Sequence, residues 1–392
     1  MSTEEWFDNV PDRKGSGSYK WDSTSDSEVI PLWVADMDFR TAPPVLEALR
    51  KRVEHGIFGY TLVGEDYYKA LKDWFDSRHG YSIRRENVIY TTGVVPAISA
   101  IIKALTKPGD GVLVQTPVYN CFFSSIRNNG CKIIEAPLKR VECGEGLFTY
   151  DMDFKILEEK ASLPEVTLML LCNPHNPAGR AWNKEELMTM AEICRRHNVT
   201  VVSDEIHCEL AMPGYDYVPY GTIDKSAIIC ISPSKAFNTA GLQIANIICP
   251  NLGIRAKIDK AININEVCDV NPFGPVALVA SYSEQGAQWL DALRGYLYAN
   301  YSLLLKMFRE NLPECPVTKL EATYLPWVDV RNLHINSTEI EERMRDEAKV
   351  WVNSGDMYGK DGYIRINIAC PRQLLEEGLR RIIGWLRKEL DK

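Results

Sequence analysis

Three continuous apolar runs, each followed by polar side chains, constrain the fold of this chain most. The runs are Thr167–Cys172, Val199–Val202 and Ala227–Ile231, and each has the length of a single strand. Stretches with the apolar spacing of helices separate them. Continuous apolar strands alternating with helices are typical of a parallel sheet that is buried on both faces. The sequence therefore predicts an α/β fold with a mainly parallel sheet.

The residues that follow these runs predict a binding site. Asn176, Asp204 and Lys235 come shortly after the three runs in turn, each about one strand–helix unit from the next. In open α/β sheets, ligands bind at the carboxyl ends of the strands. We therefore expect the three side chains to lie together at one edge of the sheet.

The chemistry of these side chains suggests pyridoxal 5′-phosphate (PLP). A desolvated lysine such as Lys235 can form a Schiff base with a carbonyl, and the hydroxyls of Ser232 and Ser234 can hold a phosphate. A carboxylate at Asp204 can keep a pyridine nitrogen protonated, so that the ring accepts electrons. Taken alone, Asp204 could be a helix N-cap or a surface acid, and Asn176 could be a turn residue. Together, and at this spacing, Asn176, Asp204 and Lys235 predict a PLP-binding site.

Composition limits the other possibilities. The chain has 392 residues and a net charge of −8, which fits two or three domains and argues against nucleic acid as a partner. No apolar stretch is long enough to cross a membrane, and no signal peptide is recognised, so we expect a cytoplasmic protein. The 11 cysteines include no C-x-x-C pair, which favours reduced thiols over disulfides or a metal site.

The order of elements predicts three parts. Residues 1–45 form an arm, 46–283 a large PLP-binding domain, and 284–392 a small α+β domain on which the arm packs. Trp33–Phe39 carries two carboxylates within an apolar patch. We interpret it as part of the packed arm rather than as a metal site.

Several segments resemble the class I/II aminotransferases, which are PLP enzymes of fold type I, over nearly the whole chain. They are Asn176–Gly179, Asp204–His207, Ser232–Lys235 and Tyr363–Asn367. Within this family the chain most resembles the cystathionine β-lyase branch, the C–S lyases that include the maltose-regulon modulator. The closer features are Trp33–Phe39, Phe58–Tyr60, Thr92–Ala97, His207 and Ser234–Asn238.

The resemblance implies roles for individual residues. Lys235 would be the Schiff-base lysine and proton shuttle, Asp204 the partner of the pyridine nitrogen, and Asn176 a ligand of the phenolic oxygen. Arg365 would bind the substrate α-carboxylate through its planar fork. The phosphate would be held by the N–H groups of Val94 and Val95 and the hydroxyls of Ser232 and Ser234. Tyr119 would stack on the ring, and Tyr60 would reach the phosphate and substrate of a neighbouring subunit in a homodimer.

Alternatives remain for some of these residues. Tyr119 could be a core residue, and Tyr60 a surface aromatic. His207 stands where aminotransferases commonly have tyrosine, and it either contacts the cofactor or only packs there. Gln243 occupies the position of an arginine that pairs with the phosphate in many relatives. More of the phosphate binding therefore falls on helix N–H groups, hydroxyls and Tyr60. No second arginine for a distal carboxylate is evident.

The preferred function is a PLP-dependent C–S β-lyase that cleaves L-cystathionine or related S-substituted cysteines to a thiol, pyruvate and ammonia. An aminotransferase would need the same lysine, aspartate, asparagine and arginine, and the choice between them depends on placement that sequence does not reveal. A third possibility is a regulatory binding protein with incidental lyase activity. It would be recognised by regulation that survives loss of Lys235.

Overall fold

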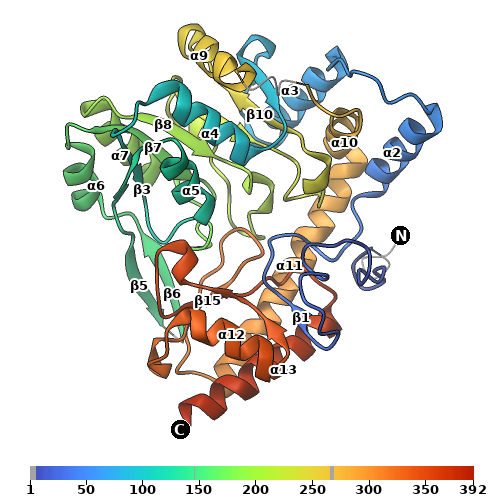
Figure 1. Ribbon diagram of the computed structural model, residues 1–392, viewed down its shortest axis with the longest axis vertical. Helices are drawn as coiled ribbons and strands as arrows, with labels where there is room; N and C mark the ends of the chain where they lie inside the picture. Colours follow the sequence, from blue (N-terminus) through green and yellow to red (C-terminus); the bar gives the residue numbers. More distant parts are fainter. Residues whose placement is uncertain (1–5, 145, 265–268) are drawn as a thin grey trace.

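A seven-stranded sheet forms the larger of two main sheets in the computed structural model, which describes residues 6–144, 146–264 and 269–392 (Figure 1). The strand order is β2–β10–β9–β8–β7–β3–β4, and β10 alone among these strands runs antiparallel to its neighbours. The bounds are β2 (Val88–Thr91), β3 (Gly111–Val114), β4 (Lys132–Glu135), β7 (Val166–Cys172), β8 (Thr200–Asp204), β9 (Ile228–Ile231) and β10 (Ala245–Ile248). The predicted α/β fold with a mainly parallel sheet is confirmed.

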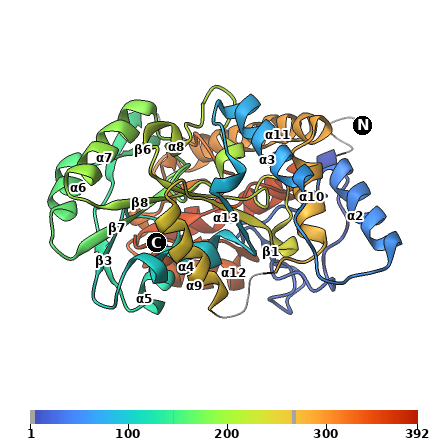
Figure 2. The ribbon, with the colours of Figure 1, turned by 90° about the horizontal axis from the view of Figure 1, so that it is seen from above.

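Helices cover both faces of this sheet (Figure 2). Along β7, Leu168 and Leu170 enter one apolar cluster, while Met169 and Leu171 enter the other. This alternation explains why the strand is apolar on both faces from Leu168 to Cys172. The helices flanking the sheet are α4 (Val94–Leu105), α5 (Asn120–Asn128) and α9 (Leu252–Asn263) on one face, and α3 (Glu65–His79), α6 (Phe154–Ala161), α7 (Lys184–Arg196) and α8 (Tyr220–Ile223) on the other.

A six-stranded sheet forms the second layer of strands, in the order β14–β15–β12–β11–β6–β5. Its bounds are β5 (Lys139–Gly144), β6 (Leu147–Asp151), β11 (Val317–Thr318), β12 (Trp327–Asp329), β14 (Asn353–Ser354) and β15 (Tyr363–Arg365). The hairpin β5–β6 joins this sheet although it lies, in sequence, between strands of the first. The domain boundaries drawn above therefore stay a prediction.

The remaining helices of the described residues pack on one another, on α3, or beside strands of the second sheet. They are α2 (Pro43–His55), α10 (Phe273–Ser281), α11 (Glu284–Asn311), α12 (Ser337–Glu347) and α13 (Arg372–Leu390). Short 3-10 turns cover Arg85–Asn87, Cys208–Leu210, Ala240–Leu242, Arg331–Leu333 and Asp356–Tyr358. None of the helices in the described part of the chain is both long and apolar enough to span a bilayer.

The N-terminal arm is anchored on the second half of the chain. Strand β1 (Ile30–Pro31) pairs in parallel with β13 (Val350–Trp351), and the ring of Trp33 stacks on that of Trp351 at 4.2 Å. Lys20 is fully buried, and its Nζ lies 2.9 Å from Asp38 Oδ2. A buried lysine needs such a partner to stay charged. The arm is thus held in place by strand pairing and ring stacking against residues 350–351.

Candidate active site

The carboxyl ends of β7, β8 and β9 lie side by side and bring the predicted residues together. Cys172, Asp204 and Cys230 are in register across the three strands. The turn after β7 carries Asn176, and the turn after β9 carries Lys235. From the second sheet, β15 adds Arg365, whose Nη1 donates to Asn176 Oδ1 at 3.1 Å. The edge of the first sheet and the end of β15 therefore form one site.

Lys235 lies half-buried in this site. Its Nζ donates to the carbonyl oxygen of Ala35, in the N-terminal arm, at 2.7 Å. Burial and the positive charge of Arg365 lower the pKa of Lys235 to about 8, although the carboxylates of Asp36 and Asp204 act in the opposite direction. An amine with a pKa in this range can carry a proton in both directions near neutral pH.

Asp204 is buried at the end of β8. Its Oδ1 accepts a hydrogen bond from the Ile206 N–H at 3.1 Å. Burial raises the pKa of Asp204 to about 7, and the nearby carboxylate of Glu205 adds to this effect. A buried carboxylate in this state is best satisfied by a cationic N–H group. The pyridinium nitrogen of PLP has this chemistry.

Arg365 is buried and only partly satisfied by the protein. Its Nη2 donates to Trp33 O at 3.0 Å, and its guanidinium lies over the ring of Tyr358 at 4.7 Å. Its Nε is buried and has no hydrogen-bond partner. An unpaired buried donor of this kind is costly. It fits a site that a carboxylate fills.

The candidate phosphate ligands come from the first turn of α4 and from the turn after β9. Val94 and Val95 open this helix, whose first N–H groups have no partner within the helix. Ser232 Oγ lies 2.9 Å from Ser234 Oγ and bonds to Ile244 O at 2.7 Å, so its hydroxyl is already engaged by the protein. Gln243 adopts a left-handed conformation, with a φ of 52°, at the end of a 3-10 turn. Helix N–H groups and Ser234 are the freer phosphate donors.

Two further predicted residues stand at the entrance to α5 and beside Asp204. Tyr119 directly precedes α5, and burial together with Cys121 raises the pKa of its phenol. Asp204 and Arg365 are close enough to Tyr119 to influence that pKa. Burial, Lys235 and Arg365 lower the pKa of His207 to about 3, and His207 Nδ1 is buried without a partner. Both rings lie in the site.

Tyr60 was also predicted to belong to the active site, but within one chain it does not lie with Lys235 and Asp204. It is 99% exposed in the loop between α2 and α3. The same loop also exposes Ile57, Phe58 and Leu62. A contribution from Tyr60 to a site would therefore require a second copy of the chain.

Sequence reasoning missed the backbone of the arm and Tyr324. Ala35 O accepts hydrogen bonds from both Lys235 Nζ and the Tyr324 hydroxyl, the latter at 3.0 Å. A backbone carbonyl has no side-chain signature. The one available signal was the segment Trp33–Phe39, which resembled the lyase branch without indicating which of its atoms mattered.

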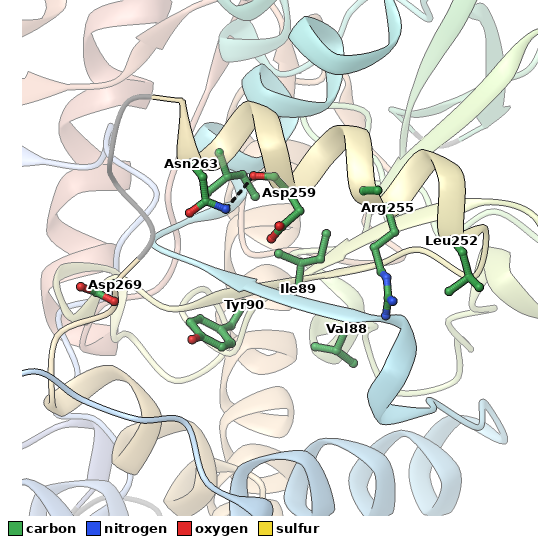
Figure 3. Close-up of a pocket in the computed structure, with 10 residues that line it drawn as sticks. Val88, Ile89, Tyr90, Leu252, Arg255, Asp259, Asn263 and Asp269 are labelled. Atoms are coloured by element: carbon green, nitrogen blue, oxygen red, sulfur yellow. Dashed lines mark hydrogen bonds between the residues drawn. The ribbon is translucent and has the colours of Figure 1, made fainter.

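A cavity of about 500 Å³ elsewhere in the protein is separate from this site (Figure 3). It lies between β2 and α9 and is lined by residues such as Tyr90, Arg255 and Asp259. None of the predicted cofactor or substrate residues borders it. The candidate active site is therefore identified from its converging polar groups and not from this cavity.

The donor set at the strand ends fits PLP. It offers a lysine amine, a buried carboxylate, an amide, free helix N–H groups and a serine hydroxyl. The unpaired Arg365 Nε and His207 Nδ1 add buried polar atoms that face no protein partner. The described residues contain no group of three or more His, Cys, Asp or Glu side chains arranged to hold a metal ion.

Comparison with known proteins agrees with this assignment. The family model "Aminotransferase class I and II" matches residues 27–382. Cystathionine beta-lyase PatB of Bacillus subtilis is 39% identical over 96% of this chain and 98% of its own length. Protein MalY of Escherichia coli is 33% identical over 97% of this chain and 98% of its own length.

A solved structure shares the whole fold. The PLP-bound C–S lyase from Staphylococcus hominis superposes with a TM-score of 0.89 at 33% identity, over 97% of this chain and 98% of that one. These relatives support a PLP-dependent C–S β-lyase of fold type I. The matched family model covers most of the chain, which therefore belongs to the aminotransferase class I and II family.

Proposed function

We propose that the protein is a PLP-dependent C–S β-lyase that cleaves S-substituted cysteines such as L-cystathionine. The observation that carries the proposal is the convergence of Lys235, Asp204, Asn176 and Arg365 at one edge of the sheet. The names of the relatives, cystathionine beta-lyase and C–S lyase, favour elimination over amino-group transfer. Overall, the substrate and one water give a thiol, pyruvate and ammonia.

Arg365 and Asn176 orient the substrate. The free Nε of Arg365 and an adjacent Nη form the planar fork that binds an α-carboxylate through two hydrogen bonds. Because Asn176 Oδ1 accepts from Nη1, the amide fixes the plane of the guanidinium. An α-carboxylate held in this way would leave the Cα–H bond of the amino acid accessible to Lys235.

Lys235 moves the proton. Bound PLP supplies an electron sink for the pair of electrons that the Cα–H bond leaves behind. The neutral amine of Lys235 takes the Cα proton at Nζ, which a pKa of about 8, lowered by burial and Arg365, makes possible near neutral pH. The resulting ammonium can return this proton to the sulfur as the Cβ–S bond breaks.

Asp204 and the helix N–H groups hold the cofactor. The carboxylate of Asp204 would pair with the pyridine N–H, and Tyr119 would stack on the ring. Val94, Val95 and Ser234 would hold the phosphate, with Gln243 contributing no positive charge. His207 is neutral at physiological pH, because burial and the adjacent cations lower its pKa to about 3.

A homodimer is part of the proposal. The loop between α2 and α3 exposes Tyr60 together with Ile57, Phe58 and Leu62, the last 87% exposed. A second copy would cover these apolar side chains and receive Tyr60 in its own site. Buried free thiols such as Cys172 and Cys230 suit the reducing cytoplasm, which is the proposed location.

Product analysis tests the proposed reaction. The purified PLP-loaded protein would be incubated with L-cystathionine, with and without a 2-oxo acid. We expect equal amounts of pyruvate and thiol in both cases. If no pyruvate forms and an amino group is transferred once the 2-oxo acid is added, the protein is an aminotransferase and not a lyase.

A further inference from the structure

The N-terminal arm contributes backbone oxygens to the candidate active site. Trp33 O accepts from Arg365 Nη2 at 3.0 Å, and Ala35 O accepts from Lys235 Nζ at 2.7 Å. Tyr324 donates its hydroxyl to the same Ala35 oxygen at 3.0 Å. The two cationic groups of the site are therefore both bonded to carbonyls of one short segment, two residues apart.

Two further carbonyls of the arm are held by one side chain. Asn367 Nδ2 donates to Val34 O at 2.5 Å and to Asp36 O at 2.7 Å, which are the carbonyls on either side of Ala35. Asn367 is fully buried, its N–H bonds to Leu32 O at 2.8 Å, and its Oδ1 accepts from the Ala369 N–H at 2.7 Å. The side-chain Nδ2 and the backbone N–H of Asn367 thus fix the arm against the segment that carries Arg365, while Oδ1 fixes the Asn367 side chain itself.

We propose that Asn367 is a positioning residue that fixes the Ala35 carbonyl as the acceptor for the Lys235 amino group whenever this amine is not bonded to the cofactor. The inference rests on the proposed function, in which Lys235 carries the Cα proton. A carbonyl oxygen that accepts from an ammonium group favours the protonated amine. Asn367 therefore influences the proton affinity of Lys235 without touching it.

The Ala35 carbonyl and the buried surroundings of Lys235 have opposite effects on the protonation of its amine. Burial and Arg365 favour the neutral amine, whereas the Ala35 carbonyl and the nearby carboxylates favour the ammonium form. The titratable and charged groups that face Lys235 are Arg365, Asp36, Asp204, Cys121, His207 and Tyr324. The Asn367 side chain is uncharged, so replacing it changes the carbonyl contact and leaves these charges in place.

The test measures the reactivity of Lys235 in the apoenzyme. An amine-specific acylating reagent labels neutral amines, and mass spectrometry gives the rate at Lys235 between pH 6 and 10. In Asn367→Ala we expect labelling at pH 7 to be about fivefold faster than in the wild type, because loss of a charge-assisted hydrogen bond favours the neutral amine. Labelling of Lys235 does not require catalytic turnover. If the wild type has no lyase activity, the proposed function is refuted, but the effect of Asn367→Ala on labelling can still be measured.

Asn300→Ala is the matched control. Asn300 is also fully buried, and its Nδ2 donates to two backbone carbonyls, Ile368 O at 2.9 Å and Cys370 O at 3.0 Å, but it bonds to no carbonyl of the arm. We expect wild-type labelling of Lys235 in this variant. Equal rates in the wild type, Asn367→Ala and Asn300→Ala would overturn the proposal, as would an equal increase in both variants.

A second experiment uses the wild-type protein, so its result does not depend on whether the variants fold. L-Alanine binds as an amino acid but has no leaving group, so it occupies the cofactor of the wild-type holoenzyme and frees Lys235. A crystal structure of this complex is expected to place Lys235 Nζ about 3 Å from Ala35 O. A free Nζ with a different acceptor would overturn the proposal. If Asn367→Ala does not fold, Asn367→Ser, which retains one donor, is expected to give a smaller increase in labelling.

Discussion

Replacing Asp204 by asparagine is expected to stabilise the apoenzyme while it weakens cofactor binding. Burial raises the pKa of Asp204 from 3.8 to about 7. The folded apoenzyme therefore binds more protons than the unfolded chain between about pH 4 and pH 7. The contribution of Asp204 to the stability of the apoenzyme therefore falls as the pH rises through this window and remains lower above it. One pKa unit corresponds to about 1.4 kcal/mol, so the buried charge costs about 4 kcal/mol at pH 8.

Asparagine has nearly the size of the protonated carboxyl group and carries no charge. Asp204→Asn apoenzyme should thus be more stable than the wild type at pH 8, by up to about 4 kcal/mol, and by less than about 1 kcal/mol near pH 4. Thermal unfolding of both apoenzymes between pH 4 and pH 8 measures this difference as several degrees in Tm. Titration with PLP, followed by visible absorption, should show weaker binding by the variant, because the pyridine N–H has lost its carboxylate. A variant that is less stable at pH 8, or equally stabilised at pH 4 and pH 8, would refute the reasoning.

Three further predictions concern single side chains. Arg365→Lys should lower kcat/KM at least about 100-fold, mainly through KM, because an ammonium lacks the planar fork; an unchanged KM would contradict this role. His207→Asn should leave the acid limb of the pH profile of kcat/KM in place between pH 5 and pH 9, because burial and the adjacent cations lower the pKa of His207 to about 3; a displaced limb would mean that this histidine titrates during catalysis. Arg180→Met should destabilise the protein by about 3–5 kcal/mol, because Glu321 and Glu186, each 2.8 Å from the guanidinium, lose their buried partner; an unchanged Tm in thermal unfolding would argue that solvent or neighbouring donors replace it.

The parallel sheet and its polar edge were predictable from local sequence. The three predicted runs correspond to β7, β8 and β9 with ends that differ by at most two residues, because continuous apolar runs record burial directly. Asp204 ends β8 and Lys235 follows β9, and these strands are neighbours in the sheet, so topology alone brings the two residues together.

The second sheet was less predictable, and the reason lies in β5 and β6. Residues of β5 are mostly exposed, so the strand has little apolar signal. Strand β6 pairs with β11, whose residues lie far away in the sequence, and no local pattern encodes such a register. The contacts of Ala35 and Trp33 could not be predicted from the sequence either, because they are made by backbone oxygens that any residue would carry.

The most direct test of the account is to identify the lysine that binds PLP. The holoenzyme would be treated with borohydride, which fixes the cofactor covalently to its lysine, and the digest would be analysed by mass spectrometry. The account predicts a phosphopyridoxyl group on Lys235 and its loss in Lys235→Ala. Modification of another lysine in the wild type, with Lys235 unmodified, would contradict the assignment of the site.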